Sequence, residues 1–311
     1  MGVLEISGLS VRFMIQSGII YAVDSVDFSM KPGESCALVG ESGCGKSVLG
    51  MSVMRLLPSN AVVTGLVRFQ NSDLTGLDEH DMQQIRGKEI AMIPQNSAMA
   101  LNPVMKIGRQ VTESLILHRG VSRKAAATTA IHLISRMGIS DPDHAMGRYP
   151  HEFSGGMQER ILIALSLACN PTLIIADEPT AGLDILIRNQ TIELLKEQSR
   201  GKTLLLITHD LGCAHNLCSR IAVMYAGEIV ESGPTSDVLS LPKHPYTLGL
   251  LASLPSAGFH PIPGMSPSPA GFPAGCRFCA RCQSATDLCH TQHPPLRIMG
   301  GSRQVRCLLY D

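Results

Sequence analysis

The sequence has no excess of charge of either sign. Lysine and arginine together number 26, and so do aspartate and glutamate, which makes the formal net charge zero over 311 residues. Proteins that coat nucleic acid carry a basic patch or a strongly positive balance. The composition therefore disfavours a nucleic-acid partner.

The sequence also lacks a long hydrophobic run. Its most apolar stretch, residues 161–169, is bounded by Arg160 and by Asn170 and Pro171. A membrane-spanning helix needs about 20 consecutive apolar residues. The start, MGVLEISGLS, has no basic segment followed by an apolar core and does not resemble a secretory signal. We therefore expect a globular protein that is not exported, but that could rest against a membrane surface.

Repeats are absent too, so the chain does not contain two copies of one unit. Alternating apolar and polar residues over 4–29 predict an antiparallel pair of strands with a turn near residues 16–18. Residues 35–40, 171–176 and 204–210 read as buried strands, and residues 221–233 as a hairpin. Helices are predicted over residues 47–57, where Pro58 stops the first, over 78–86 and over 121–137. This alternation of strands and helices predicts an α/β protein.

The composition shifts after residue 239. A KHPYT segment comes next, and residues 255–273 are rich in proline, glycine and serine, as in an extended linker. We therefore predict a main domain over residues 1–239 and a C-terminal extension over residues 240–311.

A glycine-rich loop stands between the strand at residues 35–40 and the next helix. Its sequence GESGCGKS fits the pattern G-x-x-x-x-G-K-[ST] in the strand-to-helix context that gives the pattern meaning. Glycines let backbone N–H groups turn toward phosphates, the lysine reaches the β- and γ-phosphates, and the serine hydroxyl can ligate Mg²⁺. The predicted nucleotide-binding residues here are Gly40, Glu41, Ser42, Gly43, Cys44, Gly45, Lys46, Ser47 and Val48.

Two adjacent carboxylates end the strand at residues 171–176. Asp177 is placed to hold Mg²⁺, directly or through water, and Glu178 to polarise the attacking water. Adjacent carboxylates at a strand end are often only a solvated terminus. Downstream of a phosphate loop, they predict a catalytic role.

Several motifs in one order resemble the ABC ATPases: the phosphate loop, FSGGM from Phe153, ADEP from Ala176, GLD from Gly182 and THD from Thr208. The resemblance covers roughly the first 235 residues. It implies a P-loop ABC ATPase fold: a RecA-like core, an antiparallel β subdomain and an α-helical subdomain that carries the FSGGM segment. It also implies ATP and Mg²⁺ as cofactors.

The same resemblance assigns roles to residues that would otherwise be ordinary polar surface groups. Gln95 looks like the lid glutamine that joins Mg²⁺ and the attacking water, and His209 like the switch histidine that contacts the γ-phosphate. Ser154, Gly155 and Gly156 precede a predicted helix from Met157. Free N–H groups there could face ATP bound to an opposite subunit.

Two further positions come from the family pattern. Asp184 looks like the residue that communicates across a dimer of two such chains. Phe13 is similar to the residue that stacks on adenine, with Tyr21 as the alternative; for either, a buried strand aromatic is an equally good interpretation.

Three features resemble the dipeptide, oligopeptide and nickel importer branch of this family. They are the PQNSAMALNPVMKIG segment after the lid glutamine, the KHPYT segment and the cysteines near GCRF and ARC. The sequence departs from the branch at QER, residues 158–160, where Arg-Gln-Arg is more usual. It departs again at Cys279, where a histidine is common.

Ten cysteines are present, and they fall into two groups. The scattered group, expected to be small buried hydrophobic side chains, comprises Cys36, Cys44, Cys169, Cys213 and Cys218. The clustered group in the last 36 residues comprises Cys276, Cys279, Cys282, Cys289 and Cys307.

By spacing alone, the clustered group suits thiolate ligation of an iron–sulfur cluster or of zinc. The family pattern selects four of the five, Cys276, Cys282, Cys289 and Cys307, as ligands of a [4Fe–4S] cluster, with Cys279 as a substitute or bystander. Structural zinc and a reduced tail without metal remain the alternatives.

The resemblance implies an ATP-hydrolysing importer subunit that drives uptake of di- or oligopeptides, or alternatively of nickel or a metal chelate. Its partners would be a second, different ABC ATPase, two transmembrane permease subunits and an external binding protein. Its place would be the cytoplasmic face of the cell membrane. A soluble, non-transport ABC ATPase is the other class of function; such proteins usually carry a long coiled-coil insertion or two tandem cassettes, and this sequence has neither.

Overall fold

The computed structural model of the protein describes residues 2–95 and 97–310. Its contacts group into two compact units: Met1–Thr75 together with Ile207–Asp311, and Gly76–Leu206.

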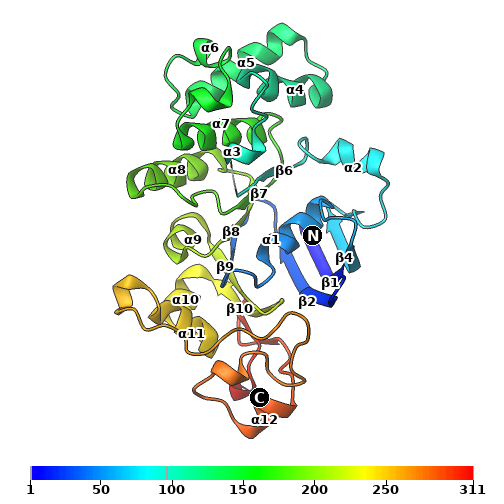
Figure 1. Cartoon of the computed structure of the whole chain (residues 1–311), viewed down its shortest axis with the longest axis vertical. Coiled ribbons are helices and arrows are strands. Elements are labelled where there is room, and N and C mark those ends of the chain that lie inside the picture. The colour runs from blue at the N-terminus through cyan, green and yellow to red at the C-terminus, as the bar shows by residue number, and fades with distance from the viewer. Residues whose placement is uncertain (1, 96, 311) are drawn as a thin grey trace. The chain divides into compact units, whose positions relative to one another are not determined.

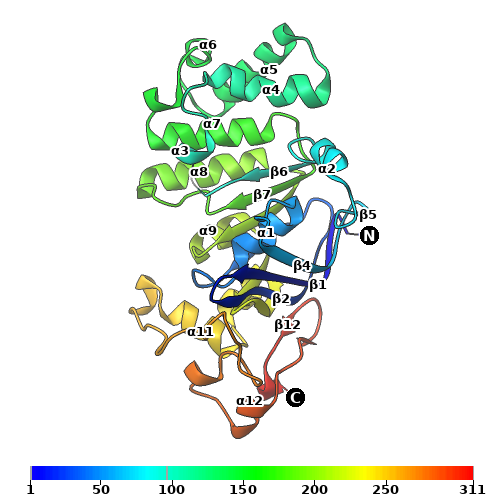
Figure 2. The ribbon, with the colours of Figure 1, turned by 45° about the vertical axis from the view of Figure 1, so that its right-hand side comes forward.

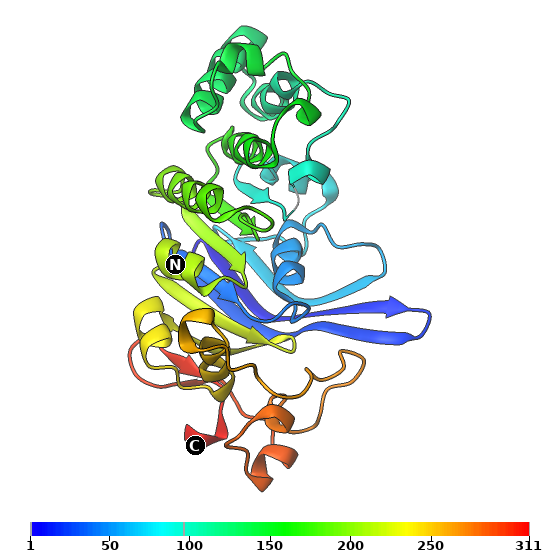
Figure 3. The same cartoon turned by 60° about the vertical axis from the view of Figure 1, so that its left-hand side comes forward.

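The first unit begins with an antiparallel sheet. β1 (Leu4–Ile15) pairs with β2 (Gly18–Met30) on one side and β4 (Ala61–Phe69) on the other, and β5 (Ser72–Asp73) is next to β4. Residues 16–17 join β1 to β2, which confirms the predicted strand pair and its turn. Figure 3 shows the β1–β2 pair, in dark blue, as a long hairpin whose tip extends past the other strands.

The same unit holds strands of a second sheet. β3 (Ser35–Val39) pairs in parallel with β9 (Arg220–Tyr225), and β9 pairs antiparallel with β10 (Glu228–Pro234), which confirms the predicted hairpin. β12 (Gln304–Val305) pairs with β10, and β11 (Arg297–Ile298) with β12. The side chains of β3 from Cys36 onward are fully buried, as are most of those of β9. These strands therefore form the core from which the phosphate loop leaves.

Three helices of this unit lie near the strands: α1 (Lys46–Met54), α9 (Leu211–Leu217) and α10 (Thr235–Ser240). The sequence predicted that α1 would run to Leu57, where Pro58 stops it, but it ends at Met54. Arg55 takes a left-handed conformation with φ of 50°, and its N–H bonds back to Ser52 O. This capped end stops the helix before the proline is reached.

The C-terminal residues of the first unit are mostly irregular. After α11 (Pro245–Ala252) come a 3₁₀ turn at Pro255–Ala257 and then residues 258–278 without helix or strand, as expected of the linker. Short elements come next: the 3₁₀ turns Cys279–Arg281 and Leu308–Tyr310 and the helix α12 (Asp287–Thr291). Figures 1 and 2 show this orange-to-red part gathered at the end of the unit beyond β10.

The second unit is a parallel strand layer with helices. β6 (Ile90–Ile93) pairs in parallel with β7 (Leu173–Asp177), and β8 (Thr203–Thr208) is next to β7 in the sheet, with its last two residues in the first unit. Every residue of β7 is buried. The buried apolar run predicted as a strand is thus a central strand of a parallel layer.

The helices of the second unit are α2 (Glu79–Ile85), α3 (Ser97–Ala100), α4 (Ile107–Arg119), α5 (Arg123–Arg136), α6 (Pro142–Ala145), α7 (Gly155–Leu167) and α8 (Ile185–Gln198), with a 3₁₀ turn at Pro150–Glu152. α7 contacts α3, α4, α5, α8 and β6. It is therefore the central helix of this unit. Within residues 2–95 and 97–310, no helix is both long enough and apolar enough to cross a bilayer.

Candidate nucleotide site

The phosphate loop connects β3 to α1 through glycines that no other residue could replace without strain. Gly43 and Gly45 have φ of +80° and +108°. A Cβ on Gly40 would lie 2.1 Å from Met224 O, and one on Gly45 would lie 2.2 Å from Ala22 O. The loop backbone therefore passes directly against β9 and β2, and only glycine allows that approach.

Lys46 opens α1 and turns its ammonium back into the loop. Its Nζ donates to Gly40 O at 2.8 Å and to Glu41 O at 2.9 Å, and the residue is 7% exposed. A buried ammonium needs such acceptors. Ser47 and Val48 come next in the first turn of α1, where backbone N–H groups point out of the helix end. This arrangement is suited to receiving phosphate oxygens.

Three more predicted residues belong to the first unit. His209 comes directly after β8 and is exposed. Phe13 is half-buried in β1, opposite Ile20 of β2. Tyr21, the alternative adenine platform, has the Arg12 guanidinium 5.1 Å from its ring centroid and the Phe272 ring 6.2 Å away.

The two carboxylates predicted to be catalytic belong to the second unit. Asp177 is the last residue of β7 and is 4% exposed, and Glu178 is 8% exposed. Glu178 has φ of +49°, and its carbonyl accepts from Ala181 N at 3.0 Å. A non-glycine residue in the left-handed region signals a turn that is held by its surroundings. The strand end is therefore a tight, buried turn and not the solvated terminus that the pair of carboxylates could also have meant.

The FSGGM segment lies at the start of α7, also in the second unit. The Ser154 hydroxyl accepts from Met157 N at 3.4 Å and caps the helix. The helix begins at Gly155, so the predicted start at Met157 is two residues late. The reason is that Gly155 and Gly156 already have helical geometry once Ser154 provides the cap.

The structure brings Asp184 close to this segment. A Cβ on Gly156 would lie 2.7 Å from Ile187 Cγ2, so the first turns of α7 and α8 are in direct contact. Asp184 caps α8 by accepting from Ile187 N at 3.0 Å. The sequence assigned Asp184 only by family resemblance and missed this capping role, although an aspartate ahead of a helix is a recognisable signal.

Gln95 is exposed and comes after β6 in the second unit. Asn96, within the segment that resembles the peptide importers, lies outside the described residues. The predicted residues are thus shared between the units. The phosphate loop, Phe13 and His209 belong to the first, and Gln95, Ser154–Gly156, Asp177, Glu178 and Asp184 to the second.

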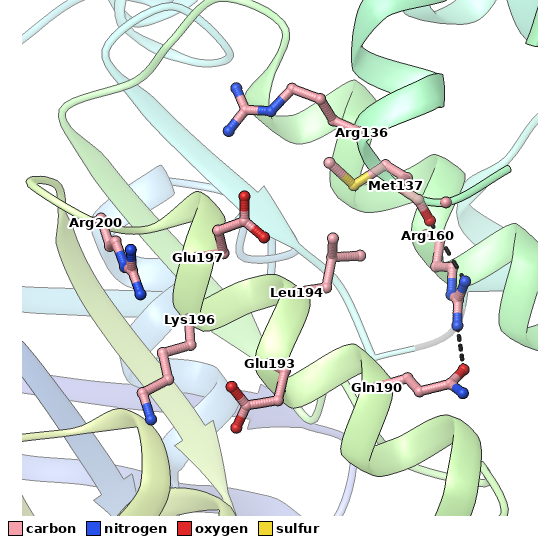
Figure 4. Close-up of a pocket in the computed structure, with 10 residues that line it drawn as sticks. Arg136, Met137, Arg160, Gln190, Glu193, Leu194, Lys196, Glu197 and Arg200 are labelled. Carbon is pink, nitrogen blue, oxygen red and sulfur yellow. Dashed lines mark hydrogen bonds between the residues drawn. The ribbon is translucent and has the colours of Figure 1, made fainter.

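The QER departure has a structural counterpart. Gln158 Nε2 donates to Pro150 O at 2.9 Å and to Phe153 O at 3.1 Å, which ties α7 to the turn before it. Arg160 donates to Gln190 Oε1 at 2.5 Å and lines a shallow hollow of about 780 Å³ between α5, α7 and α8 (Figure 4). Its lining carries charges of both signs, and it contains none of the predicted nucleotide-binding residues.

The five scattered cysteines are buried thiols that form no disulfide, and their burial is as predicted. The clustered five lie in one lobe of the extension. Gly275 packs so closely on α12 that a Cβ would lie 2.3 Å from Cys289 O, and Cys276 N donates to that carbonyl at 2.8 Å. Burial raises the pKa of the Cys276 thiol to about 12. Cys276, Cys279 and Cys289 line one hollow of about 410 Å³.

This lobe meets only part of the requirement for a metal site. Its donor set has the right chemistry, because five thiols lie in the last 36 residues and the Gly275 contact holds the segments of Cys276 and Cys289 together. Among residues 2–95 and 97–310, however, no three His, Cys, Asp or Glu side chains are positioned to hold a metal ion. The thiols would have to turn toward a common point to do so.

Two contacts to the phosphate loop were not foreseen from the sequence. Tyr246 and Arg281 of the extension both bond to Glu41. Tyr246 belongs to the KHPYT segment, which the sequence marked by resemblance alone. Arg281 stands 240 positions from Glu41, and no local pattern could have related the two.

Comparison with known proteins gives two family matches. Residues 23–181 match the family described as ABC transporter, and residues 230–289 match the family described as oligopeptide/dipeptide transporter, C-terminal region. The second match covers most of β10, all of α11 and the first four clustered cysteines.

Two relatives from Bacillus subtilis align along nearly the whole chain. The oligopeptide transport ATP-binding protein AppD is 43% identical over 317 residues, which cover 99% of this chain and 97% of AppD. The dipeptide transport ATP-binding protein DppD is 44% identical over 318 residues, which cover 99% of this chain and 95% of DppD.

Among solved structures, the dimeric post-hydrolysis state of the ATP-binding cassette MJ0796, bound to ADP and Pi, is similar to this chain. It has a TM-score of 0.67 and 28% identity and covers 75% of this chain and 98% of its own. This likeness confirms the predicted α/β fold of an ABC ATPase cassette.

Proposed function

This chain belongs to the ABC transporter family and is an ABC-type ATPase, and we propose that it drives an importer of di- and oligopeptides. The observation that carries the proposal is the joining of an ABC cassette to the oligopeptide/dipeptide transporter C-terminal region in one chain. Nickel or metal-chelate import by the same engine is the second candidate, because the KHPYT segment and the terminal cysteines also resemble that part of the branch.

The proposed chemistry uses the residues of each unit in turn. The N–H groups of the loop over residues 40–48 bind the phosphates, and Lys46 moves from the loop carbonyls to the β- and γ-phosphates. Mg²⁺ would be held by Ser47, Asp177 and Gln95, and when bound it would neutralise part of the phosphate charge. Glu178 orients and polarises the attacking water, and His209 donates a hydrogen bond to the γ-phosphate.

A second chain completes the site. The N-terminal end of α7, with Ser154 as its cap, offers N–H groups to the γ-phosphate of ATP bound on the opposite subunit. Asp184, beside that helix end, would relay the state of one site to the other. ATP then holds two cassettes together, and its hydrolysis releases them.

The Tyr21 contacts favour Phe13 as the adenine platform. One face of Tyr21 has the Arg12 guanidinium over it, and Phe272 of the linker lies nearby. Phe13 is half-buried, so part of its ring is exposed, and an exposed aromatic ring can stack on adenine.

Uptake assays test the importer proposal. The chain would be co-expressed with its genomic neighbours, which we propose encode a second, different ATPase, two permease subunits and an external binding protein. Membranes should retain the chain at their cytoplasmic face, and vesicles should accumulate labelled dipeptide when ATP is supplied. Lys46→Ala should abolish accumulation without preventing assembly. A chain that stays entirely in the soluble fraction would instead favour a non-transport ABC ATPase.

We also propose a [4Fe–4S] cluster on Cys276, Cys282, Cys289 and Cys307, with zinc as the alternative ion. The support is the four-thiol donor set in one lobe and the Gly275 contact that holds Cys276 against α12. Anaerobic purification should give broad visible absorption with about four iron and four sulfide per chain.

Matched variants identify the ligands. Cys289→Ser should lose the metal, whereas Cys279→Ser should keep it if Cys279 is a bystander. Zinc at about one per chain without visible absorption would select the alternative. A metal-free, correctly folded protein would remove the proposal.

A further inference from the structure

The C-terminal extension holds the phosphate loop at its second residue. Arg281 forms a two-pronged ion pair with the Glu41 carboxylate, Nη1 to Oε2 and Nη2 to Oε1, each at 2.9 Å. The Ser266 hydroxyl donates to the same carboxylate at 2.8 Å. The Glu41 N–H donates to the Tyr246 hydroxyl at 2.9 Å. Both the backbone and the side chain of Glu41 are therefore fixed by residues more than 200 positions away.

Arg281 is itself rigidly seated. Its side chain is 7% exposed, and Nε donates to Pro263 O at 3.0 Å. Its guanidinium carbon lies 5.7 Å from the Tyr225 ring centroid and 5.9 Å from that of Phe278. Guanidinium groups bind well over aromatic faces and to carboxylates through paired bonds. Arg281 thus reaches Glu41 from a fixed position in the cysteine lobe, between Cys279 and Cys282.

Glu41 connects this contact to Lys46, the lysine of the phosphate loop. Its carbonyl accepts from Lys46 Nζ at 2.9 Å, while its carboxylate is held by Arg281. Burial by itself raises the pKa of the Glu41 carboxyl, but hydrogen bonds from Arg281 and Ser266 and nearby positive charge lower it below its ordinary value. The phosphate loop therefore carries a negative charge whose direct ion pair comes from Arg281 of the extension.

An unneutralised carboxylate in this loop would oppose the binding of a polyanion. ATP carries one more negative charge than ADP, so the repulsion between the Glu41 carboxylate and the nucleotide is greater for ATP. Lys46 would also be drawn toward Glu41 and away from the phosphates. The Arg281 pairing removes both effects before the nucleotide arrives.

We propose that Arg281 is a positioning residue for ATP binding, which neutralises Glu41 and fixes the phosphate loop from the C-terminal extension. Tyr246 and Ser266 complete the contact. This role concerns ATP binding alone and is independent of what the importer carries or whether the cysteines hold metal.

The experiment compares nucleotide affinity in variants of the full-length chain. Fluorescent analogues of ATP and ADP, with Mg²⁺, would be titrated against the wild type, Arg281→Ala, Arg281→Lys, Glu41→Gln and the double variant Arg281→Ala/Glu41→Gln. Arg281→Ala should raise the Kd for ATP about tenfold and that for ADP less. KM for ATP should rise similarly while kcat changes little. The Kd of Arg281→Lys for ATP should lie between those of Arg281→Ala and the wild type.

The double variant separates charge from general damage. If the Glu41 charge causes the loss, removing it should restore most of the ATP affinity of Arg281→Ala, although a second contact has been deleted. Arg303→Ala is the matched control, because Arg303 also belongs to the extension and pairs with a buried carboxylate, Glu231, at 2.6 Å, while its other hydrogen bonds go to the carbonyls of Asp237 and Leu241 and not to the loop. It should lower thermal stability and leave the Kd for ATP unchanged.

Three results would overturn the proposal. One is an unchanged Kd for ATP in a folded Arg281→Ala protein. Another is a double variant as weak as Arg281→Ala, and the third is an Arg303→Ala protein that loses ATP affinity to the same extent. If Arg281→Ala does not fold, Arg281→Lys carries the test, and a Kd for ATP equal to that of the wild type would reject the role.

Discussion

At Gly40 the phosphate loop leaves β3 so close to β9 that a single methyl group decides whether the loop can form. We expect Gly40→Ala to lower the free energy of unfolding by more than about 2 kcal/mol, because its Cβ would lie 2.1 Å from Met224 O. ATP binding should be lost with it. Denaturant unfolding and nucleotide titration would measure both effects.

Gly33→Ala is the control for that substitution. Gly33 also has a positive φ, +73°, but apart from its two chain neighbours no described residue has an atom within 4 Å of the position of its Cβ. Gly33→Ala should therefore lower the free energy of unfolding by about 1 kcal/mol, from backbone strain alone, and leave ATP binding intact. Equal losses in the two variants would contradict the steric explanation.

His244 gives a prediction for the pH dependence of stability. Burial lowers the pKa of its imidazole to about 3, and its Nδ1 accepts from Tyr246 N at 3.0 Å. Between that value and the ordinary pKa of about 6.5, the unfolded chain binds a proton that the folded chain does not. Stability should therefore be unaffected above about pH 7 and fall as the pH drops toward 3.

The expected slope is up to about 1.4 kcal/mol per pH unit for this one group. Unfolding free energies measured from pH 7 to pH 4 would show it. In His244→Asn the amide oxygen can still accept from Tyr246 N, but the titrating group is gone. The plot of unfolding free energy against pH should therefore lose up to about 1.4 kcal/mol per pH unit of its slope. An unchanged curve would mean that other groups control the acid response.

Among single residues, the sequence predicted best those whose side-chain chemistry and spacing together fit a known motif. The loop over residues 40–47 and the pair Asp177 and Glu178 were recognised because glycines, a lysine and strand-end carboxylates have few other reasons to occur in that order. The Arg281–Glu41 pair was not foreseeable, because an ion pair between distant residues leaves no periodic signal. The end of α1 at Met54 depends on the left-handed conformation of Arg55, which arginine shows no general tendency to adopt.

Among the elements, α7 is a helix whose cap is proposed to have two functions. Ser154 caps α7 by accepting from Met157 N at 3.4 Å, and Ser122 caps α5 in the same way from Ala125 N at 3.3 Å. Ser154→Ala and Ser122→Ala should each lower the free energy of unfolding by about 1 kcal/mol. Only Ser154→Ala should also reduce ATP hydrolysis, since only α7 is proposed to face the nucleotide of an opposite subunit.

Thermal unfolding and steady-state ATPase rates would test this pair together. Similar ATPase rates in both variants would argue against a catalytic role for the start of α7.

The two hairpins could be predicted from the sequence, because β1 with β2 and β9 with β10 have alternating patterns and turn residues. The start of α7 was predicted two residues late because glycine has a low helix propensity, although the Ser154 cap allows the helix to begin at Gly155.

At the scale of the whole molecule, the predicted boundary between residues 239 and 240 can be tested by truncation. Glu231 of β10 is fully buried, and its carboxylate accepts from Lys243 N and His244 N at 2.9 Å and pairs with Arg303. A chain ending at residue 239 would leave this carboxylate without those partners. Breaking a buried charge pair in this way costs about 3–5 kcal/mol.

We therefore expect the truncated chain to unfold at a much lower temperature than the full chain. Glu231→Gln should recover part of the loss in the truncated chain and lower the stability of the full chain, an inversion that unspecific damage would not produce. Full stability of the 1–239 fragment would support the boundary as drawn from composition.

The composition indicated where the proline- and glycine-rich extension begins, but it could not show that Glu231 of β10 depends on Lys243, His244 and Arg303 beyond that boundary.

The separation of Glu41 from Arg281 along the chain also has a consequence for biosynthesis. A ribosome adds about 5–20 residues per second, so roughly 10–50 s pass between the appearance of Glu41 and that of Arg281. During that interval the nascent phosphate loop has its glycines and lysine but not the guanidinium that pairs with Glu41. The last bonds to Glu41 thus form only when translation is nearly finished, and a chain that ends before residue 281 has a Glu41 carboxylate without its ion pair.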